Sequence, residues 1–384
     1  MTRVNYETLG QFIDIDEKDL EFERVTNSID VVDREYGVEV IFDYYRRYGF
    51  PHYKIREDEK HEHMRKLKKF DVDTIFIDNQ IVQTMHCLRL AWSYFPFFWE
   101  VQCGHSRTSP MQAFNDDKIF KSVITKCWNW EQKHYKGEDP KGERNKFHEN
   151  RLRQSLKLYS GVQAVSNFRP TAAKVIYEKF GGDGVIWDMS CGWGGRLLGA
   201  LSSKRIKKYI GTEPSTKTFE GLNKIKEEFS YLGKEVELYC LGSEVFRPKE
   251  QVDLCFTSPP YFNTEKYADE PTQSYIKFPT EQEWIDGFLF QTLQNTFDST
   301  KVNGYLLLNI ANTSSGKNIE NGTLEIAEKI GYSHINTLRL NLSTMARDGD
   351  GSGSKYEPIF VFKKEKHIES NVPNPYGDDG WATP

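Results

Sequence analysis

Short apolar runs alternate with helix-length segments throughout residues 161–384, and this alternation constrains the fold more than any other feature. The runs are rich in β-branched and aromatic residues, which is typical of buried strands. Segments 216–229 and 281–298 have the apolar spacing of helices. The alternation predicts an α/β fold with a mainly parallel twisted sheet and helices on both faces, and such sheets bind ligands at the carboxyl ends of their strands. The predicted strands are 185–189, 208–212, 236–240, 252–256, 305–310 and 357–362.

The first 160 residues have a different pattern, in which helical spacing dominates, for example over 38–47 and 116–135. We therefore expect three parts. A mostly helical N-terminal domain covers residues 1–160, an α/β domain covers 161–363, and a flexible C-terminal tail covers 364–384.

The net charge of −5 hides a gradient along the chain. Residues 1–45 sum to −8 (4 basic, 12 acidic), residues 46–160 to +7 (22 basic, 15 acidic), and residues 161–384 to −4 (25 basic, 29 acidic). Basic residues interleaved with aromatic ones suit phosphate contacts and base stacking, so 46–160 is a candidate nucleic-acid or target-recognition region. The same charges are also typical of solvated helices, and the sequence leaves both interpretations open. The candidate contacts are Arg46, Arg47, Arg151 and Arg153.

Several function classes are disfavoured. No stretch approaches the ~20 apolar residues of a membrane span, and the N-terminus has no apolar signal segment, so we expect a cytoplasmic protein. The six cysteines lack paired spacing, which indicates free thiols. No CxxC or HxxxH pattern occurs, and we expect no metal site.

The first predicted strand of the α/β domain ends at Asp188 and runs into a glycine-rich turn, SCGWGG. Gly192 and Gly194 let the backbone bend sharply and approach a ligand closely. The next strand ends at Glu213, where a carboxylate can accept hydrogen bonds from the ribose hydroxyls of an adenosine ligand. The alternative is that Glu213 caps the following helix. With the polar turn after the third strand at 242–244, these features predict an adenosine-type cofactor site.

The fourth strand runs directly into Thr-Ser-Pro-Pro-Tyr-Phe at 257–262. Two consecutive prolines fix φ and remove two backbone donors, so this loop is rigid and presents acceptors in a set direction. Ser258 and the carbonyl of Pro259 can each accept one hydrogen of an exocyclic amine, while Tyr261 stacks on the ring that carries it. The loop therefore predicts chemistry on a planar heterocyclic amine.

The motifs DMSCGWGG and TSPPYF, in that order, resemble the S-adenosylmethionine-dependent DNA amino-methyltransferases. Asn-Phe-Arg-Pro at 167–170 is similar to the cofactor-contacting motif that precedes the first strand in that family. The resemblance covers residues 161–363 and implies a class I, Rossmann-like methyltransferase fold with S-adenosyl-L-methionine as cofactor and DNA as partner.

The resemblance also implies roles for single residues. The cofactor would be held by Phe168, Asp188, Ser190, Gly192, Gly194 and Glu213, with Ser243 and Glu244 near its adenine. The target base would be positioned by Ser258, Pro259, Pro260 and Tyr261, with Phe262 as a further contact.

The target base stays open between cytosine and adenine, since both carry an exocyclic amine. RNA, a modified base and a protein side-chain amide also stay open as substrates. Serine as the first loop residue resembles the N4-cytosine enzymes more than the N6-adenine ones. The enzyme is expected to work with a cognate restriction endonuclease or with none, and a non-catalytic specificity subunit is the alternative from another class. Segment 263–279 is predicted to cover the active site or touch the substrate, with an ordinary surface loop as the alternative, and 345–354 is predicted to be a mobile loop near DNA.

Overall fold

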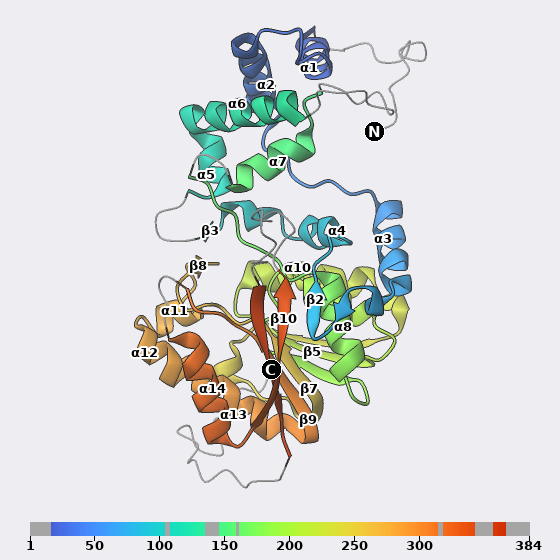
Figure 1. Ribbon diagram of the computed structural model, residues 1–384, viewed down its shortest axis with the longest axis vertical. Coiled ribbons are helices and arrows are strands. Elements are labelled where there is room, and N and C mark those ends of the chain that lie inside the picture. The colour runs from blue at the N-terminus through green and yellow to red at the C-terminus, as the bar shows by residue number, and fades with distance from the viewer. Residues whose placement is uncertain are drawn as a thin grey trace. The chain divides into compact units, whose positions relative to one another are not determined.

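The computed structural model describes residues 17–103, 108–134, 146–158, 161–313, 318–341 and 356–365. The chain divides into two compact units (Figure 1). The first unit comprises residues 1–52 and 99–164, and the second comprises residues 53–98 and 165–384.

The first unit is mostly helical, as the sequence predicts. Asp33 caps the second helix, because its Oδ1 accepts the Tyr36 N–H at 3.0 Å. Close packing between two helices depends on Gly37, since a Cβ there would overlap the Trp128 ring. The elements are α1 (Glu17–Asn27), α2 (Arg34–Tyr48), β3 (Gln102–Cys103), α5 (Pro110–Asn115), α6 (Asp117–His134) and α7 (Glu149–Leu158).

The second unit is built on a nine-stranded sheet with the order β1-β2-β10-β11-β9-β7-β4-β5-β6. All neighbours are parallel except at β11 and β1, which run antiparallel to the strands beside them. From β6 to β9 the sequence order is 3-2-1-4-5, the doubly wound order. The strands are β1 (Phe76–Ile77), β2 (Gln80–Val82), β4 (Val185–Asp188), β5 (Lys208–Thr212), β6 (Glu235–Tyr239), β7 (Val252–Thr257), β9 (Thr300–Asn309), β10 (Ser333–Asn341) and β11 (Tyr356–Lys363).

Helices cover both faces of this sheet, so the predicted fold class, a mainly parallel sheet of Rossmann-like type, is confirmed (Figure 1). Side chains alternate along the buried strands, so Trp187 and Cys255 belong to the core under α13 and α14, while Phe256 packs on Tyr177 of α8. The helices are α3 (Glu57–Lys69), α4 (Leu88–Ser93), α8 (Pro170–Phe180), α9 (Gly195–Ser202), α10 (Thr216–Glu228), α11 (Ser274–Lys277), α12 (Glu281–Glu283), α13 (Phe290–Ser299) and α14 (Ile319–Ile330).

Shorter elements complete the second unit. A π-helix, η6, leads into α13. The short elements are η2 (Val72–Thr74), η4 (Ser230–Leu232), η5 (Ser243–Val245), β8 (Glu265–Lys266) and η6 (Trp284–Leu289), and η3 (Pro96–Glu100) lies where the chain passes between units.

Residues 53–98 pack with the sheet, whereas the sequence-based division at residue 160 groups them with the N-terminal helices. β2 adds to the sheet beside β10, with Ile81 opposite Leu340. The buried Lys174 of α8 donates to the carbonyls of Leu67, Lys68 and Phe70 at 2.8 to 3.0 Å. These bonds cap the carboxyl end of α3 and attach it to the α/β unit.

Two predicted flexible segments, 345–354 and most of the tail, 366–384, lie outside the described residues. Within the described ranges, no helix is both long and apolar enough to cross a membrane. The described residues likewise hold no group of three or more His, Cys, Asp and Glu side chains arranged to bind a metal ion. All six cysteines are described, and none forms a disulfide.

Candidate active site

The glycine-rich turn joins the carboxyl end of β4 to the start of α9. Gly192 and Gly194 have φ values of +58° and +73°, which explains why glycine stands there. A Cβ on Gly194 would come within 2.5 Å of Ile225, so this position also lacks room. A Cβ on Gly192 would come no closer than 3.7 Å to its nearest neighbour, the Arg196 guanidinium. The backbone at Gly192 is therefore approachable, as a ligand-binding turn requires.

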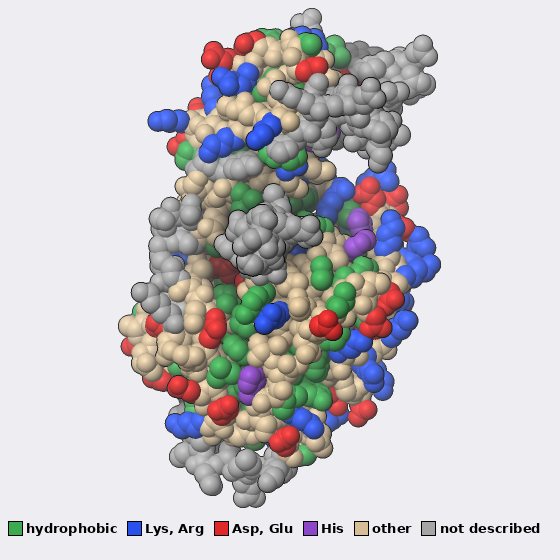
Figure 2. Space-filling view, viewed as in Figure 1, with side chains coloured by type: hydrophobic (Ala, Val, Ile, Leu, Met, Phe, Trp, Pro, Cys, Tyr) green, Lys and Arg blue, Asp and Glu red, His purple; other side chains and the backbone are tan. Residues whose placement is uncertain are grey.

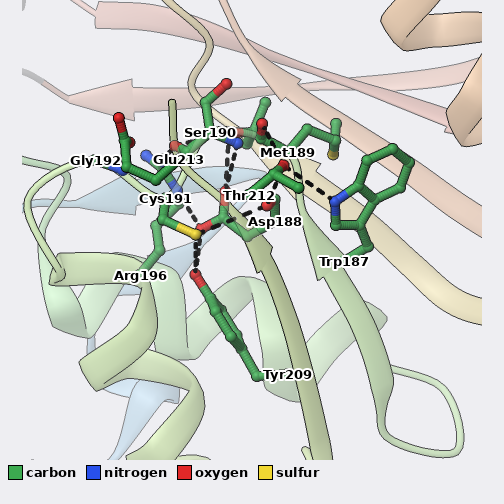
Figure 3. Close-up of polar contacts among 11 residues, drawn as sticks. Trp187, Asp188, Met189, Ser190, Cys191, Gly192, Arg196, Tyr209, Thr212 and Glu213 are labelled. Atoms are coloured by element: carbon green, nitrogen blue, oxygen red, sulfur yellow. Dashed lines mark hydrogen bonds and ion pairs between the residues drawn. The ribbon is translucent and has the colours of Figure 1, made fainter. Parts of the chain in front are cut away.

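Asp188 holds this turn together from below (Figure 3). Its carboxylate is fully buried and accepts from Arg196 Nε at 2.8 Å and from the Tyr209 hydroxyl at 2.7 Å. The Ser190 N–H and the Thr257 hydroxyl donate to the other oxygen at 3.3 and 3.0 Å. Both oxygens are thus occupied by protein donors, which balances the buried charge. Asp188 therefore braces the turn, and its direct contact with a cofactor stays a prediction.

Thr212, the last residue of the neighbouring strand β5, bonds to the backbone of the same turn. The Thr212 hydroxyl donates to the Met189 carbonyl at 2.8 Å, and the Cys191 N–H donates to the Thr212 carbonyl at 2.9 Å (Figure 3). The carbonyl of Ser190 accepts from Arg196. These bonds leave the turn little freedom, so it is preorganised.

The segment before α8 clamps the turn from another side. The Asn167 amide donates to the Trp193 carbonyl at 2.9 Å, and a Cβ on Gly195 would overlap the Phe168 carbonyl. The Phe168 ring lies 5.3 Å from the ring of Phe256. The sequence places Phe168 here, but it assigns no role to Asn167, whose only signal is its place in the Asn-Phe-Arg-Pro motif.

Glu213 lies at the carboxyl end of β5, facing Gly192 (Figure 3). One carboxylate oxygen accepts the Gly192 N–H at 2.9 Å and the other accepts the Ser215 N–H at 3.1 Å. Burial raises the pKa of Glu213 to about 7, although the two backbone donors act against this shift. Each oxygen keeps a lone pair beyond its backbone bond, so the group suits a ligand with two hydroxyl donors.

Ser243 and Glu244 lie together in η5, after β6. The Ser243 hydroxyl bonds the Thr292 hydroxyl at 2.9 Å, and Glu244 forms an ion pair with Lys277. The Asn295 amide donates to both of their carbonyls at 3.0 and 3.2 Å. Both side chains are buried and engaged within the protein.

Segment 263–279 contacts the turn that follows β5. Glu270 accepts from the N–H and the hydroxyl of Thr216, at 3.2 and 2.9 Å. The Thr272 hydroxyl donates to the Pro214 carbonyl at 3.0 Å. With the ion pair from Lys277, these contacts connect the segment to the turns after β5 and β6, and the sequence predicts such proximity to the site.

The Ser-Pro-Pro-Tyr loop follows β7, whose six residues are all buried. Pro259 is buried, while Ser258 and Pro260 are partly exposed. The Tyr261 hydroxyl lies 3.2 Å from both the Asn309 carbonyl at the end of β9 and Glu357 Oε2 of β11. These acceptors hold the aromatic ring in place from two strands.

Phe262 does not reach the site, contrary to the sequence-based hypothesis of a substrate contact. Its φ of +55° turns the side chain inward, where it is 5% exposed and packs near Trp284. Phe262 thus anchors the far end of the loop in the hydrophobic core.

The side chain of Thr257 joins the glycine-rich turn to the Ser-Pro-Pro-Tyr loop. The Thr257 hydroxyl lies 3.0 Å from Asp188 Oδ1 and 3.3 Å from the Ser190 carbonyl. β4 and β7 are adjacent parallel strands, yet the chain leaves β4 toward β5 on the other side. The glycine turn and the Ser-Pro-Pro-Tyr loop therefore meet at the topological switch point, where doubly wound sheets bind ligands.

The four candidate arginines of the first unit make internal contacts. Arg46 pairs with Asp117 at 2.8 Å, and the Arg151 guanidinium lies 3.3 Å from the Trp130 ring centroid. Arg153 is 7% exposed and pairs with Glu149. Arg47 lies 5.6 Å from the ring of Tyr48. Their contacts with nucleic acid stay a prediction.

Charges on α3, the basic stretch of the second unit, are also mixed. Figure 2 shows acidic and basic side chains together over this helix. Lys60 pairs with Glu57 at 2.7 Å, and Arg65 pairs with Glu62 at 2.5 Å. Exposed pairs of this kind contribute little to stability, and they weaken the case for a purely basic surface here.

Among known proteins, this chain is similar to several whose structures have been solved. No family model matches the chain, and no curated protein matches it. A methyltransferase from Pyrococcus furiosus is 17% identical, with a TM-score of 0.36, over 51% of this chain and 82% of that one. The N-methyltransferase NodS from Bradyrhizobium japonicum is 8% identical, with a TM-score of 0.36, over 51% and 94%. Magnesium protoporphyrin IX methyltransferase from Synechocystis, with bound SAM, is 14% identical, with a TM-score of 0.33, over 47% and 69%.

Proposed function

We propose that this protein is an S-adenosylmethionine-dependent DNA methyltransferase that methylates the exocyclic N4 amine of cytosine. The observation that carries the proposal is the pairing of two loops at the switch point. Thr257 joins the braced glycine turn to the Ser-Pro-Pro-Tyr loop, within 3.0 Å of Asp188 and 3.3 Å of Ser190. A methyl donor on the first loop and an amine on the second would lie side by side.

The residues present fit the cofactor. Gly192 offers an approachable backbone, and the two Glu213 oxygens keep acceptor capacity for the two ribose hydroxyls. The Phe168 ring adds an apolar contact beside the turn. S-adenosylmethionine, when bound, supplies an electrophilic methyl group on a positively charged sulfur. Asp188 keeps the turn in shape for it.

The target amine would be oriented by acceptors of the catalytic loop. Ser258 Oγ and the Pro259 carbonyl would each accept one amine hydrogen, with the ring of Tyr261 against the base. An aromatic amine donates its lone pair into its ring and is a poor nucleophile. Holding its hydrogens out of the ring plane favours a tetrahedral nitrogen, which would attack the methyl carbon as the bond from that carbon to sulfur breaks. S-adenosylhomocysteine would leave, and the extra proton on the nitrogen would pass to solvent.

No protein nucleophile is required. Cys191 and Cys255 lie near the loops but are 1% and 0% exposed. Burial raises the pKa of Cys255 to about 12 and raises that of Cys191 well above its usual value, so both are thiols at neutral pH. The buried thiols favour direct transfer over a covalent intermediate.

Cytosine is preferred to adenine because of Ser258, since serine at this place resembles the N4-cytosine enzymes. The intact loop favours catalysis over a binding-only subunit. An enzyme that acts alone and one that works with a restriction endonuclease are both compatible with this proposal.

The proposal is tested by offering the protein S-adenosylmethionine with a radiolabelled methyl group and, in separate reactions, DNA, RNA and a protein extract. Label is expected in DNA and is expected to disappear in the Tyr261→Ala variant. Label in RNA or protein alone, or label that survives Tyr261→Ala unchanged, would contradict the proposal.

A further inference from the structure

The guanidinium of Arg169 is partly buried, and most of its N–H groups have no hydrogen-bond partner among the described residues. It lies between Phe168 and the first residue of α8, Pro170, and is partly buried. Its Nε donates to Gln83 Oε1 at 3.0 Å, and this is the only hydrogen bond of its side chain to the described residues. A guanidinium carries five N–H donors, so four are left over. Neither Nη atom is sealed from solvent.

Three other buried cations of this unit have charged or carbonyl partners within the protein. Arg196 pairs with Asp188, Lys174 donates to three carbonyls, and Lys364 donates to two carbonyls at 2.6 and 2.9 Å. Burial lowers the pKa of Arg169, and the Tyr53 hydroxyl is the one group that opposes this. No carboxylate among the described residues forms an ion pair with it. The N–H groups of Arg169 that have no partner among the described residues reach solvent, so they can donate to a group from outside the chain.

The place of Arg169 identifies that partner. Gln83 directly follows β2, whose last residue, Val82, lies opposite Asn341 at the end of β10. Asn341 in turn lies opposite Tyr356, the residue before Glu357, which holds Tyr261. Arg169 therefore belongs to the same edge of the sheet as the Ser-Pro-Pro-Tyr loop, and through Gln83 it is connected to the side of β2, β10, β11 and β9.

We infer that the Arg169 guanidinium binds a backbone phosphate of the nucleic-acid strand that carries the target base. This inference rests on the proposed function and deepens it. The planar fork of an arginine matches two phosphate oxygens, and both Nη atoms are available for them. A nucleic-acid strand supplies such a phosphate beside every base, so one anchored phosphate would set the position of the flipped nucleotide relative to Tyr261.

Three variants test the inference. Arg169→Gln removes the charge, and Arg169→Lys keeps the charge but removes the fork. Arg205→Gln is the matched control, because Arg205 is also an arginine of this unit but precedes β5, at the amino edge of the sheet, and donates to the Gly182 carbonyl at 3.3 Å. Affinity for a fluorescent oligonucleotide is measured at several salt concentrations, and affinity for S-adenosylhomocysteine is measured by calorimetry.

Arg169→Gln is expected to weaken oligonucleotide binding by roughly 10-fold and to reduce the salt slope by about 1, with unchanged affinity for S-adenosylhomocysteine. Arg169→Lys should fall between this variant and the wild type, and Arg205→Gln should match the wild type. Unchanged oligonucleotide affinity in Arg169→Gln would overturn the inference. A loss of S-adenosylhomocysteine affinity instead would overturn it too, since Arg169 would then serve the cofactor.

A second probe separates this inference from the proposed function. Inorganic pyrophosphate at millimolar concentration should raise the melting temperature of the wild type and of Arg205→Gln, but not of Arg169→Gln. If the wild type methylates no nucleic acid, the proposed function fails while this result still shows an oxyanion site at Arg169. If Arg169→Gln responds to pyrophosphate as the wild type does, the site itself is refuted.

Discussion

Replacing Thr257 with valine removes the hydroxyl that joins the two loops and leaves the shape of the side chain nearly unchanged. Thr257 is fully buried, and its single hydroxyl hydrogen is shared between Asp188 at 3.0 Å and the Ser190 carbonyl at 3.3 Å. Asp188 keeps its bonds from Arg196, Tyr209 and the Ser190 N–H. The change is therefore a clean removal of one bond to a buried carboxylate.

A buried hydrogen bond to a charged group contributes about 1.5 to 3 kcal/mol. We expect Thr257→Val to lower the free energy of unfolding by that amount, which corresponds to a fall in melting temperature of roughly 3 to 6 °C for a unit of this size. Because the glycine turn loses its connection to the catalytic loop, affinity for S-adenosylhomocysteine and the rate of methyl transfer should fall together.

Thr323→Val is the matched control. Thr323 is also fully buried, but its hydroxyl donates to the Ile319 carbonyl within α14, at 2.7 Å, away from both loops. Calorimetric titration and thermal melts of the two variants are compared with the wild type. The reasoning is refuted if Thr257→Val binds S-adenosylhomocysteine as tightly as Thr323→Val does, since the hydroxyl would then have no role in shaping the cofactor turn.

Three further predictions follow from the site. Tyr261→Ala should lose roughly 1 to 3 kcal/mol of base stacking and cut activity more than it cuts cofactor affinity, as measured by kinetics and calorimetry; an equal loss in both would contradict a role at the base. Glu213→Ala should weaken S-adenosylhomocysteine binding in calorimetry and leave DNA affinity unchanged, and the opposite ordering would exclude Glu213 from the cofactor site. Because burial raises the pKa of Glu213 to about 7, and because only the ionised form accepts strongly from two hydroxyls, cofactor affinity should rise from pH 6 to pH 8 in the wild type and stay flat in Glu213→Gln. If the cofactor affinity of the wild type did not change between pH 6 and pH 8, the ionisation of Glu213 would not be coupled to cofactor binding.

The sheet and its strand-end residues could be predicted because the information is local. A buried strand, a glycine turn and a helix follow one another within 185–202, and Glu213 closes the next strand. The contribution of residues 53–98 could not be predicted in this way. β2 is three residues long, and its partner, β10, lies far along the chain. The one sequence feature that indicates this contact is Lys174, a charged residue between the apolar pairs 172–173 and 175–176 of α8.

The directions of side chains and their pairings could not be predicted from the sequence either. Asp188 ends its strand as predicted, but nothing in the spacing reveals that Arg196 and Tyr209 converge on it. Phe262 belongs to the predicted loop, yet its positive φ sends the ring into the core. Such details depend on backbone geometry and long-range packing, whereas residue types report only what chemistry is available.

The proposed chemistry is tested most directly by identifying the methylated base. Duplex DNA is incubated with the protein and S-adenosylmethionine carrying a deuterated methyl group, then digested to nucleosides and analysed by mass spectrometry. The account predicts N4-methyldeoxycytidine with the deuterated methyl group, and none in the Tyr261→Ala reaction. Labelled N6-methyladenine in its place would reassign the base, and no labelled nucleoside from folded protein that binds the cofactor would contradict the proposed function.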